Sequence, residues 1–271
     1  MRVSALFVFA ALGCKTPVEA PEELGDVSLF LFANFDGDDE VLAAGLANLD
    51  AFLGSQDLAA GLADRSVTLP VLDATNLGAV TGPDGVDAAS QVPIGVFGES
   101  PNGLEGHIGL VADPNQICIA SDSTVFAART FLTPVDCFVD GTCPRVDTSN
   151  ETRTETIIAD VWIDIFGDYR RVLLEDGREA MVARGWIDEV FVADGGNNSW
   201  DQRYTLDVWI PTESGTTRRF YGMWSSASLG IGDDVYASLV KSGLDEYFAN
   251  ADGMILGEVC GNDRDRVNDR P

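Results

Sequence analysis

The sequence of 271 residues has very little of the residue types on which much enzyme chemistry depends. It contains one histidine, His107, two lysines, Lys15 and Lys241, and five cysteines. Serine and cysteine hydrolases usually need a histidine base, so any such mechanism has to involve His107. The segment 98–102 lacks the second glycine of a nucleophile elbow. One histidine and no CxxC pair also argue against a zinc site. We therefore predict an ordinary hydrogen-bonding role for His107, in a strand over 107–112, and no cofactor.

Basic charge is scarce as well. Against 44 acidic side chains there are 17 lysines and arginines, which gives a formal net charge of −27. Such a chain repels phosphate backbones, so nucleic acid is not expected as a partner. The acid excess is typical of a soluble exported protein or of a saline habitat, and cation binding is the alternative. In the acidic segment from Asn34, the sixth position is Asp39 and the twelfth is Gly45, which differs from a calcium loop.

We interpret these acids as the start of a helix over 39–54, capped by Asp38 or Asp39. Its apolar stripe comprises Leu42, Leu46, Leu49 and Leu53. The short apolar run over 27–32, which ends at the acidic segment, predicts a strand entering a turn.

A long apolar segment is missing from the N-terminus, where Val3 to Leu12 are too few residues to span a bilayer. A positive start and a short apolar run indicate a secretory signal. The residues Ala11-Leu12-Gly13-Cys14 resemble the lipobox of bacterial lipoproteins, although the family usually has leucine and the small residue in the opposite order. The resemblance implies a signal peptide over 1–13 and acylation of Cys14, for example by palmitate. An ordinary signal peptide cut elsewhere is the alternative.

Residues 14–24 then form a lipidated tether, since Thr16 to Leu24 contain two prolines and three glutamates. Lys15 is not the aspartate that typically retains lipoproteins in the inner membrane. The resemblance therefore implies an outer-membrane lipoprotein, with the membrane as partner through its anchor.

We predict a single globular domain over 25–260, of α+β class, followed by a flexible tail over 261–271. A meander over 155–226 is indicated by period-2 alternation through Val161, Ile163 and Ile165, and by turns at 175–178 and 195–198. A long C-terminal helix is predicted from Asp233 to Ala249. We expect a curved antiparallel sheet packed by the N-terminal and C-terminal helices. This arrangement over 155–256 resembles a helix-grip, START-like domain in architecture only.

Four cysteines besides Cys14 predict two disulfides in an exported chain. Cys137 and Cys143 enclose a short segment with an Asp-Gly pair, which favours a local bridge and leaves Cys118 for Cys260.

Large side chains occur on both faces of the predicted sheet, either because helices cover both faces or because the sheet curves around a cavity. In the second case we expect some of four tryptophans to line a pocket beneath the C-terminal helix, with Arg184 or Arg219 holding a polar end. The tryptophans are Trp162, Trp186, Trp209 and Trp224.

Seven arginines on the meander have two explanations. Cross-strand pairing with Asp160, Asp164, Asp188 and Asp207 is one, and a site for a carboxylate or an anionic headgroup is the other. The arginines are Arg170, Arg171, Arg178, Arg184, Arg203, Arg218 and Arg219.

The first function hypothesis is binding of a small apolar or amphipathic ligand between sheet and helix, without catalysis. The second is a structural or interaction protein of the cell envelope, with envelope proteins as partners and no pocket. The third is a hydrolase with paired carboxylates, which would need two carboxylates converging in an apolar pocket with pKa values pushed apart.

Overall fold

The computed structural model describes residues 18–155 and 160–258. The predicted signal peptide, Cys14, Cys260 and the tail over 261–271 lie outside these ranges. Among the described residues, no helix has the length and apolar character needed to cross a membrane.

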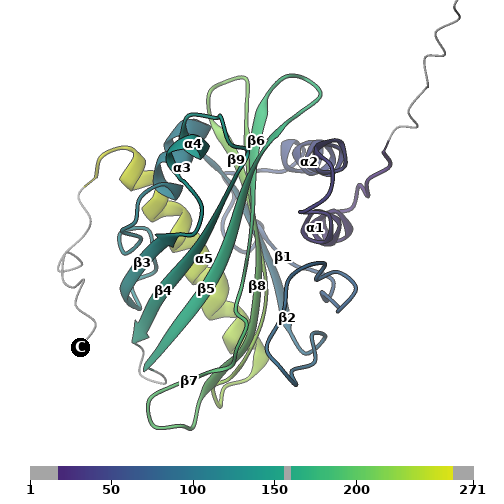
Figure 1. Ribbon diagram of the computed structural model, residues 1–271. Helices are drawn as coiled ribbons and strands as arrows, with labels where there is room; N and C mark the ends of the chain where they lie inside the picture. The colour runs from purple at the N-terminus through teal and green to yellow at the C-terminus, as the bar shows by residue number, and fades with distance from the viewer. Residues whose placement is uncertain (1–17, 156–159, 259–271) are drawn as a thin grey trace, which may run out of the picture.

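The predicted α+β class with a curved antiparallel sheet and a long C-terminal helix is confirmed (Figure 1). The described strands form one sheet in the order β1-β2-β9-β8-β6-β5-β4-β3, with β7 beside β8. The strands are β1 (Ser66–Thr68), β2 (Val92–Ser100), β3 (Thr124–Phe131), β4 (Arg145–Glu155), β5 (Asp160–Leu173), β6 (Glu179–Trp186), β7 (Phe191–Val192), β8 (Ser199–Pro211) and β9 (Thr217–Ser228).

The meander extends from β3 to β9, and its turns lie where the sequence predicts them. β5 and β6 are joined through Gly177 with φ 87°, and β7 and β8 through Gly195 and Gly196 with φ 94° and 74°. Glycine adopts this left-handed backbone without steric cost, so the turn chemistry sets the strand lengths. The first half of the chain adds β2 to the free edge at β9.

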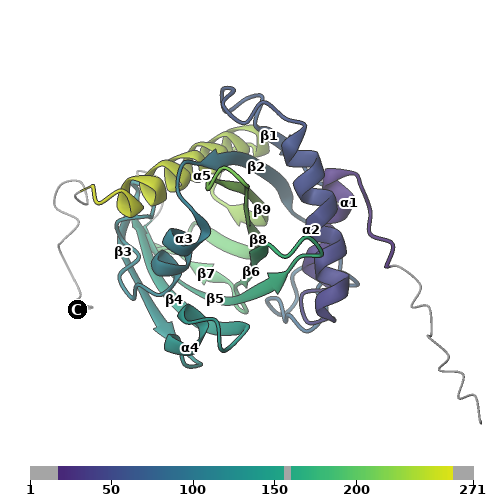
Figure 2. The same cartoon turned by 90° about the horizontal axis from the view of Figure 1, so that it is seen from above.

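Two N-terminal helices cover the outer face of the curved sheet (Figure 2). The predicted helix over 39–54 is confirmed as α2 (Asp39–Gly54), but the strand predicted over 27–32 is wrong, because these residues belong to α1 (Leu24–Ala33). Leu24, Val27 and Leu31 are buried at helical spacing, and a short apolar run does not separate a buried helix from a strand.

The outer core is aromatic where α1 crosses the sheet. The ring centroid of Phe32 lies 6.3 Å from that of Tyr204 and 5.9 Å from that of Trp224, both edge-on. Tyr204 and Trp224 are cross-strand neighbours, and Trp186 flanks Tyr204 on β6. These large rings exclude water from this face.

Helices α3 (Leu104–Val111) and α5 (Asp233–Ile255) lie on the inner, concave side of the sheet (Figure 2). The strand predicted over 107–112 is therefore wrong. Leu104, His107, Ile108 and Val111 are buried on one side of α3, which is a helical spacing. The C-terminal helix begins at the predicted Asp233 and continues to Ile255.

The acidic segment before α2 binds arginines of the meander. The side chain of Asp38, the N-cap residue, makes no capping hydrogen bond, so the predicted side-chain cap is not formed there. Asp36 lies 2.7 Å from both Arg145 and Arg184, and Asp39 lies 2.5 Å from Arg170. No group of histidine, cysteine and acidic residues suited to a metal ion occurs in the described ranges. The acids thus attach the helical pair to the sheet.

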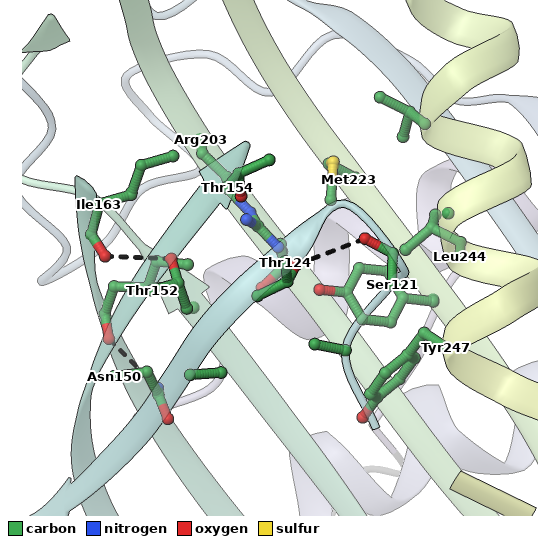
Figure 3. Close-up of a pocket in the computed structure, with 18 of the residues that line it drawn as sticks. Ser121, Thr124, Asn150, Thr152, Thr154, Ile163, Arg203, Met223, Leu244 and Tyr247 are labelled. Carbon is green, nitrogen blue, oxygen red and sulfur yellow. Dashed lines mark hydrogen bonds between the residues drawn. The ribbon is translucent and has the colours of Figure 1, made fainter. Parts of the chain in front are cut away.

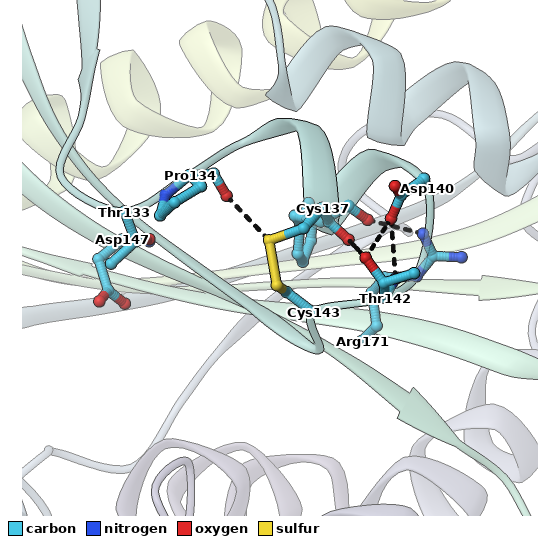
Figure 4. Close-up of a disulfide and its surroundings, with 9 residues drawn as sticks. Thr133, Pro134, Cys137, Asp140, Thr142, Cys143, Asp147 and Arg171 are labelled. Carbon is cyan, nitrogen blue, oxygen red and sulfur yellow. Dashed lines mark hydrogen bonds between the residues drawn. A yellow bond between two sulfur atoms is a disulfide. The ribbon is translucent and has the colours of Figure 1, made fainter.

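The local disulfide between Cys137 and Cys143 is confirmed, with an S–S distance of 2.09 Å (Figure 4). It joins α4 (Asp136–Val139) to the segment before β4. Cys118 is disulfide-bonded too. Its predicted partner, Cys260, is outside the described residues, so that pairing stays a prediction.

Candidate functional site

A cavity of about 540 Å³ lies between the concave face of the sheet and α5 (Figure 3). The segment between α3 and β3 forms its side wall, where Asn250 of α5 donates a hydrogen bond of 2.8 Å to the Ala120 carbonyl. The apolar part of the wall includes Ile119, Ile163, Ile165, Trp200, Met223, Leu229, Val240 and Leu244. Hydroxyl-bearing side chains of the sheet include Thr124, Thr152, Thr154 and Thr205. The cavity therefore has an apolar and a polar component.

Asp207 of β8 is the most perturbed acid in this wall. Burial raises its pKa to about 8, against the opposing effect of Arg219. Oδ1 has no hydrogen-bond partner among the described residues, and Oδ2 accepts a long bond of 3.4 Å from the Tyr247 hydroxyl. Asp207 is therefore mostly an uncharged carboxylic acid at neutral pH, able to donate or accept one further hydrogen bond.

Arg219 fills the space between β9 and the C-terminal half of α5. Its guanidinium carbon lies 3.9 Å from the centroid of the Phe248 ring, and one nitrogen lies 3.6 Å from Asp252. The side chain is 1% exposed and is not part of the cavity wall. Arg219 therefore packs α5 against the sheet instead of holding a ligand in this cavity.

His107 points from α3 toward Trp209, with ring centroids 6.5 Å apart. Burial, with a contribution from Arg219, lowers the pKa of His107 to about 3, and its Nε2 has no partner in the described part of the chain. An imidazole with this pKa is a weak base, which does not suit a general base near neutral pH.

Arg129 of β3 braces the neighbouring strands through uncharged groups. It donates hydrogen bonds of 2.7 Å each to Asn150 Oδ1, the Val111 carbonyl and the Tyr169 hydroxyl. Its guanidinium carbon also lies 5.0 Å from the centroid of the Tyr169 ring. The polar end of the cavity is thereby held in a defined shape.

None of the four predicted tryptophans is in the cavity wall. Trp186 and Trp224 belong to the outer core. On β5, Trp162 is adjacent to the cavity residue Ile163, so strand alternation places its side chain on the outer face. There its ring centroid lies 5.3 Å from that of Phe126. Trp209 is on the inner side but packs against α3 in a separate core cluster. The expectation that these rings line the pocket is therefore corrected.

Trp200 is the tryptophan that lines the cavity, and sequence reasoning missed it. An unbroken alternation along β8 would place Trp200 on the same face as Tyr204, which is the outer face. The pairing of β8 with β9 shifts register between Trp200 and Gln202, and such an irregularity redirects the side chain. The sequence pattern has no separate signal for this shift.

Arg184 touches the cavity wall, but its charge is used on the outer face. Its guanidinium binds Asp168 at 2.9 Å and Asp36 at 2.7 Å, and its carbon lies 4.5 Å from the centroid of the Phe35 ring. The predicted role of Arg184 in holding a ligand therefore conflicts with these contacts.

Comparison of the sequence with protein-family models and with curated proteins finds no match. Several solved structures are similar in fold. A STAR-related lipid transfer protein from Xanthomonas axonopodis has 11% sequence identity and a TM-score of 0.44, covering 60% of this chain and 85% of that one. A START superfamily protein from Mycobacterium smegmatis has 9% identity and a TM-score of 0.38, covering 61% and 97%.

The lipid transfer and protein localization domain of human StarD13 has 8% identity and a TM-score of 0.37, covering 60% of this chain and 76% of its own. The similar structures thus include START-like domains. At these identities the likeness concerns the fold, so function has to be inferred from the cavity itself.

Proposed function

We propose that this protein binds a small amphipathic molecule, without catalysis, in the cavity between the concave face of the sheet and α5. The observation that carries the proposal is the cavity of about 540 Å³, with aliphatic side chains from α5 and hydroxyls from the strands. Ligand pockets typically have volumes of a few hundred Å³, are mainly apolar and contain a few polar groups that fix orientation.

The cavity wall also has polar groups in need of partners. Asp207 Oδ1 is buried and has no partner among the described residues, which costs free energy unless a bound group or water supplies the bond. A purely structural envelope protein would gain nothing from such a group in its core. A ligand with one polar end explains both the empty volume and the orphan carboxyl.

The test is to fill the cavity. Thr152→Trp places a large ring among the lining residues, whereas Leu173→Trp places the same ring on the β5–β6 hairpin, where Leu173 is 64% exposed. Titration with the neutral probe Nile red should show saturable binding to the wild type and to Leu173→Trp, and loss of binding in Thr152→Trp. Circular dichroism verifies that each variant is folded. Absence of saturable binding to the folded wild type would contradict the proposal.

We further propose that the domain is exported and anchored to the outer membrane through an acylated Cys14. The disulfide Cys137–Cys143 supports an oxidising compartment. Stable anchoring requires more than one acyl chain. Cys14→Ser should release the protein into the soluble fraction and abolish incorporation of labelled palmitate in a bacterial host. Continued labelling of the variant would rule out Cys14 as the acylation site.

A further inference from the structure

Nearly every arginine in the described ranges has a carboxylate partner. The pairs are Arg65–Asp245, Arg145–Asp36, Arg153–Asp160, Arg170–Asp39, Arg171–Glu179, Arg178–Asp50, Arg184–Asp168, Arg218–Asp50 and Arg219–Asp252. Two arginines of the same ranges, Arg129 and Arg203, have no carboxylate within 4.0 Å, and both line the cavity.

These pairs also revise the expected cross-strand pairing. Within the described residues, none of the seven meander arginines forms an ion pair with Asp160, Asp164, Asp188 or Asp207. Their partners come mainly from α2, the segment before it and neighbouring strand positions, which places most of the arginines in structural roles. The second explanation, a site for an anion, therefore applies only to arginines that line the cavity and have no carboxylate partner in the described part of the chain, which are Arg129 and Arg203.

Arg129 and Arg203 differ in how their nitrogens are satisfied. Arg129 donates to three neutral acceptors, as described above. For Arg203, Nε is buried and has no partner among the described residues, and its side chain forms no ion pair there. In Figure 3 the nitrogen atoms of Arg203 lie toward the middle of the drawn pocket, in the region of Thr124 and Thr154. Of the two described cavity arginines without a carboxylate, Arg203 is thus the one with a buried unused donor; the unpartnered nitrogens of Arg184 and Arg219 belong to side chains that already pair with carboxylates.

Little negative charge in the wall opposes an anion at this place. The acids among the lining residues are Asp207 and Glu246. Glu246 accepts a hydrogen bond of 2.9 Å from the Asp122 amide, at the side wall. Asp207 is mostly protonated at neutral pH because burial raises its pKa to about 8. In a chain of net charge −27, the cavity therefore has a local excess of positive charge.

We infer that the ligand of this cavity carries an anionic group, a carboxylate or a phosphate monoester, which binds the guanidinium of Arg203. A guanidinium is a permanent cation with donors in a fixed fork that matches both oxyanions. The hydroxyls of Thr124 and Thr154 can donate additional hydrogen bonds, and the aliphatic wall accommodates the rest of the molecule. This inference rests on the proposed binding function and specifies its ligand class.

The experiment compares three probes with one alkyl chain: dodecanoic acid, dodecanol and dodecyl phosphate. Each probe displaces Nile red from the purified protein at pH 7 and fixed ionic strength. We expect the wild type to bind at least one of the two anions about tenfold or more tightly than dodecanol, which corresponds to a charge-assisted hydrogen bond. Preference between acid and phosphate identifies the anionic group.

Arg203→Met removes the charge and keeps an apolar side chain, so it should lose the preference for the anion while dodecanol binds as before. Arg203→Lys should retain part of the preference. The matched control is Arg153→Met on the outer face, where Arg153 pairs with Asp160. This variant should behave as the wild type does.

The possible failures are distinguishable. Equal affinity of the wild type for dodecanol and both anions, or an unchanged anion preference in Arg203→Met, overturns the anionic ligand but leaves the binding function intact. Binding of none of the three probes to the folded wild type overturns the binding function and the anionic ligand together.

Discussion

The two faces of the sheet are built from different side chains. On the outer face, α1 and α2 meet a continuous apolar core, and even the Trp224 indole nitrogen donates to the Pro70 carbonyl at 2.8 Å. On the inner face, threonines, arginines and Asp207 line a cavity beneath α5. The same strands therefore supply a well-packed side and an incompletely packed one.

Unsatisfied polar atoms show the same difference. In the described part of the chain, buried nitrogens or oxygens without partners occur on the inner side at five residues, His107, Arg203, Asp207, Trp209 and Arg219, and also at Arg184 and Gln202. The outer core has its arginines bound to acids of α2 and the preceding segment. The comparison predicts that stability depends chiefly on the outer face. Under the proposed binding function, the inner face gives up stability to leave room for a ligand.

Truncating an outer aromatic ring should have the largest effect. Phe32 is fully buried against Tyr204 and Trp224, and Phe32→Ala leaves a cavity that the packed helices cannot close. We expect a loss of about 3–5 kcal/mol in the free energy of unfolding. Urea unfolding followed by circular dichroism measures it. A loss below that of the inner-face variants would refute the assignment of stability to the outer face.

Neutralising Asp207 should change how stability depends on pH. The folded protein keeps the Asp207 proton up to about pH 8, whereas the unfolded chain releases it near pH 4, so unfolding releases a proton between these values. The contribution of this group therefore falls as pH rises through the window, and is lowest above pH 8. Between about pH 4 and pH 8, the free energy of unfolding of Asp207→Asn should therefore rise relative to that of the wild type by about 1.4 kcal/mol per pH unit.

Urea unfolding at pH 5.5, 6.5 and 7.5 tests this slope. Asp188→Asn, which changes an exposed carboxylate after β6, is the control. A difference between Asp207→Asn and the wild type that stays constant with pH would show that Asp207 is ionised in the folded protein.

Removing the Cys137–Cys143 disulfide should cause an intermediate loss of stability. The bridge constrains α4, whose Phe138 packs in the cluster of Trp209 and Ile108. For a sequence separation of 6, loop closure accounts for about 2 kcal/mol. The double variant Cys137→Ala, Cys143→Ala should lose this much stability in urea unfolding under oxidising conditions. Because Cys118 is disulfide-bonded too, the two proteins should match in stability when both are fully reduced.

Replacing a threonine of the cavity should have the smallest effect. The Thr152 hydroxyl donates to the Ile163 carbonyl at 3.1 Å, and Thr152→Val removes this bond while keeping the shape. We expect a loss of no more than about 1 kcal/mol. A loss as large as that of Phe32→Ala in the same unfolding experiment would show that the inner face is as tightly coupled to stability as the outer one.

Local patterns determined much of the fold by themselves. Asp176-Gly177 and Gly195-Gly196 specify turns because glycine accepts positive φ, and the leucines of α2 specify a helix through their spacing. The short separation of Cys137 and Cys143 likewise predicted their bridge. Local patterns failed at 27–32 and 107–112, where short apolar runs fit a helix and a strand equally well.

The candidate site was decided by tertiary structure. Closure of α5 over a curved sheet creates the cavity, and that closure depends on residues far apart in the chain. A register shift turned Trp200 inward, while Trp186 and Trp224 became part of the outer core. Nothing in the spacing of the meander arginines separates Arg184 from Arg203. Only the folded chain brings Asp36 and Asp168 to Arg184 and leaves Arg203 without a carboxylate among the described residues, because ion pairing depends on distances in space.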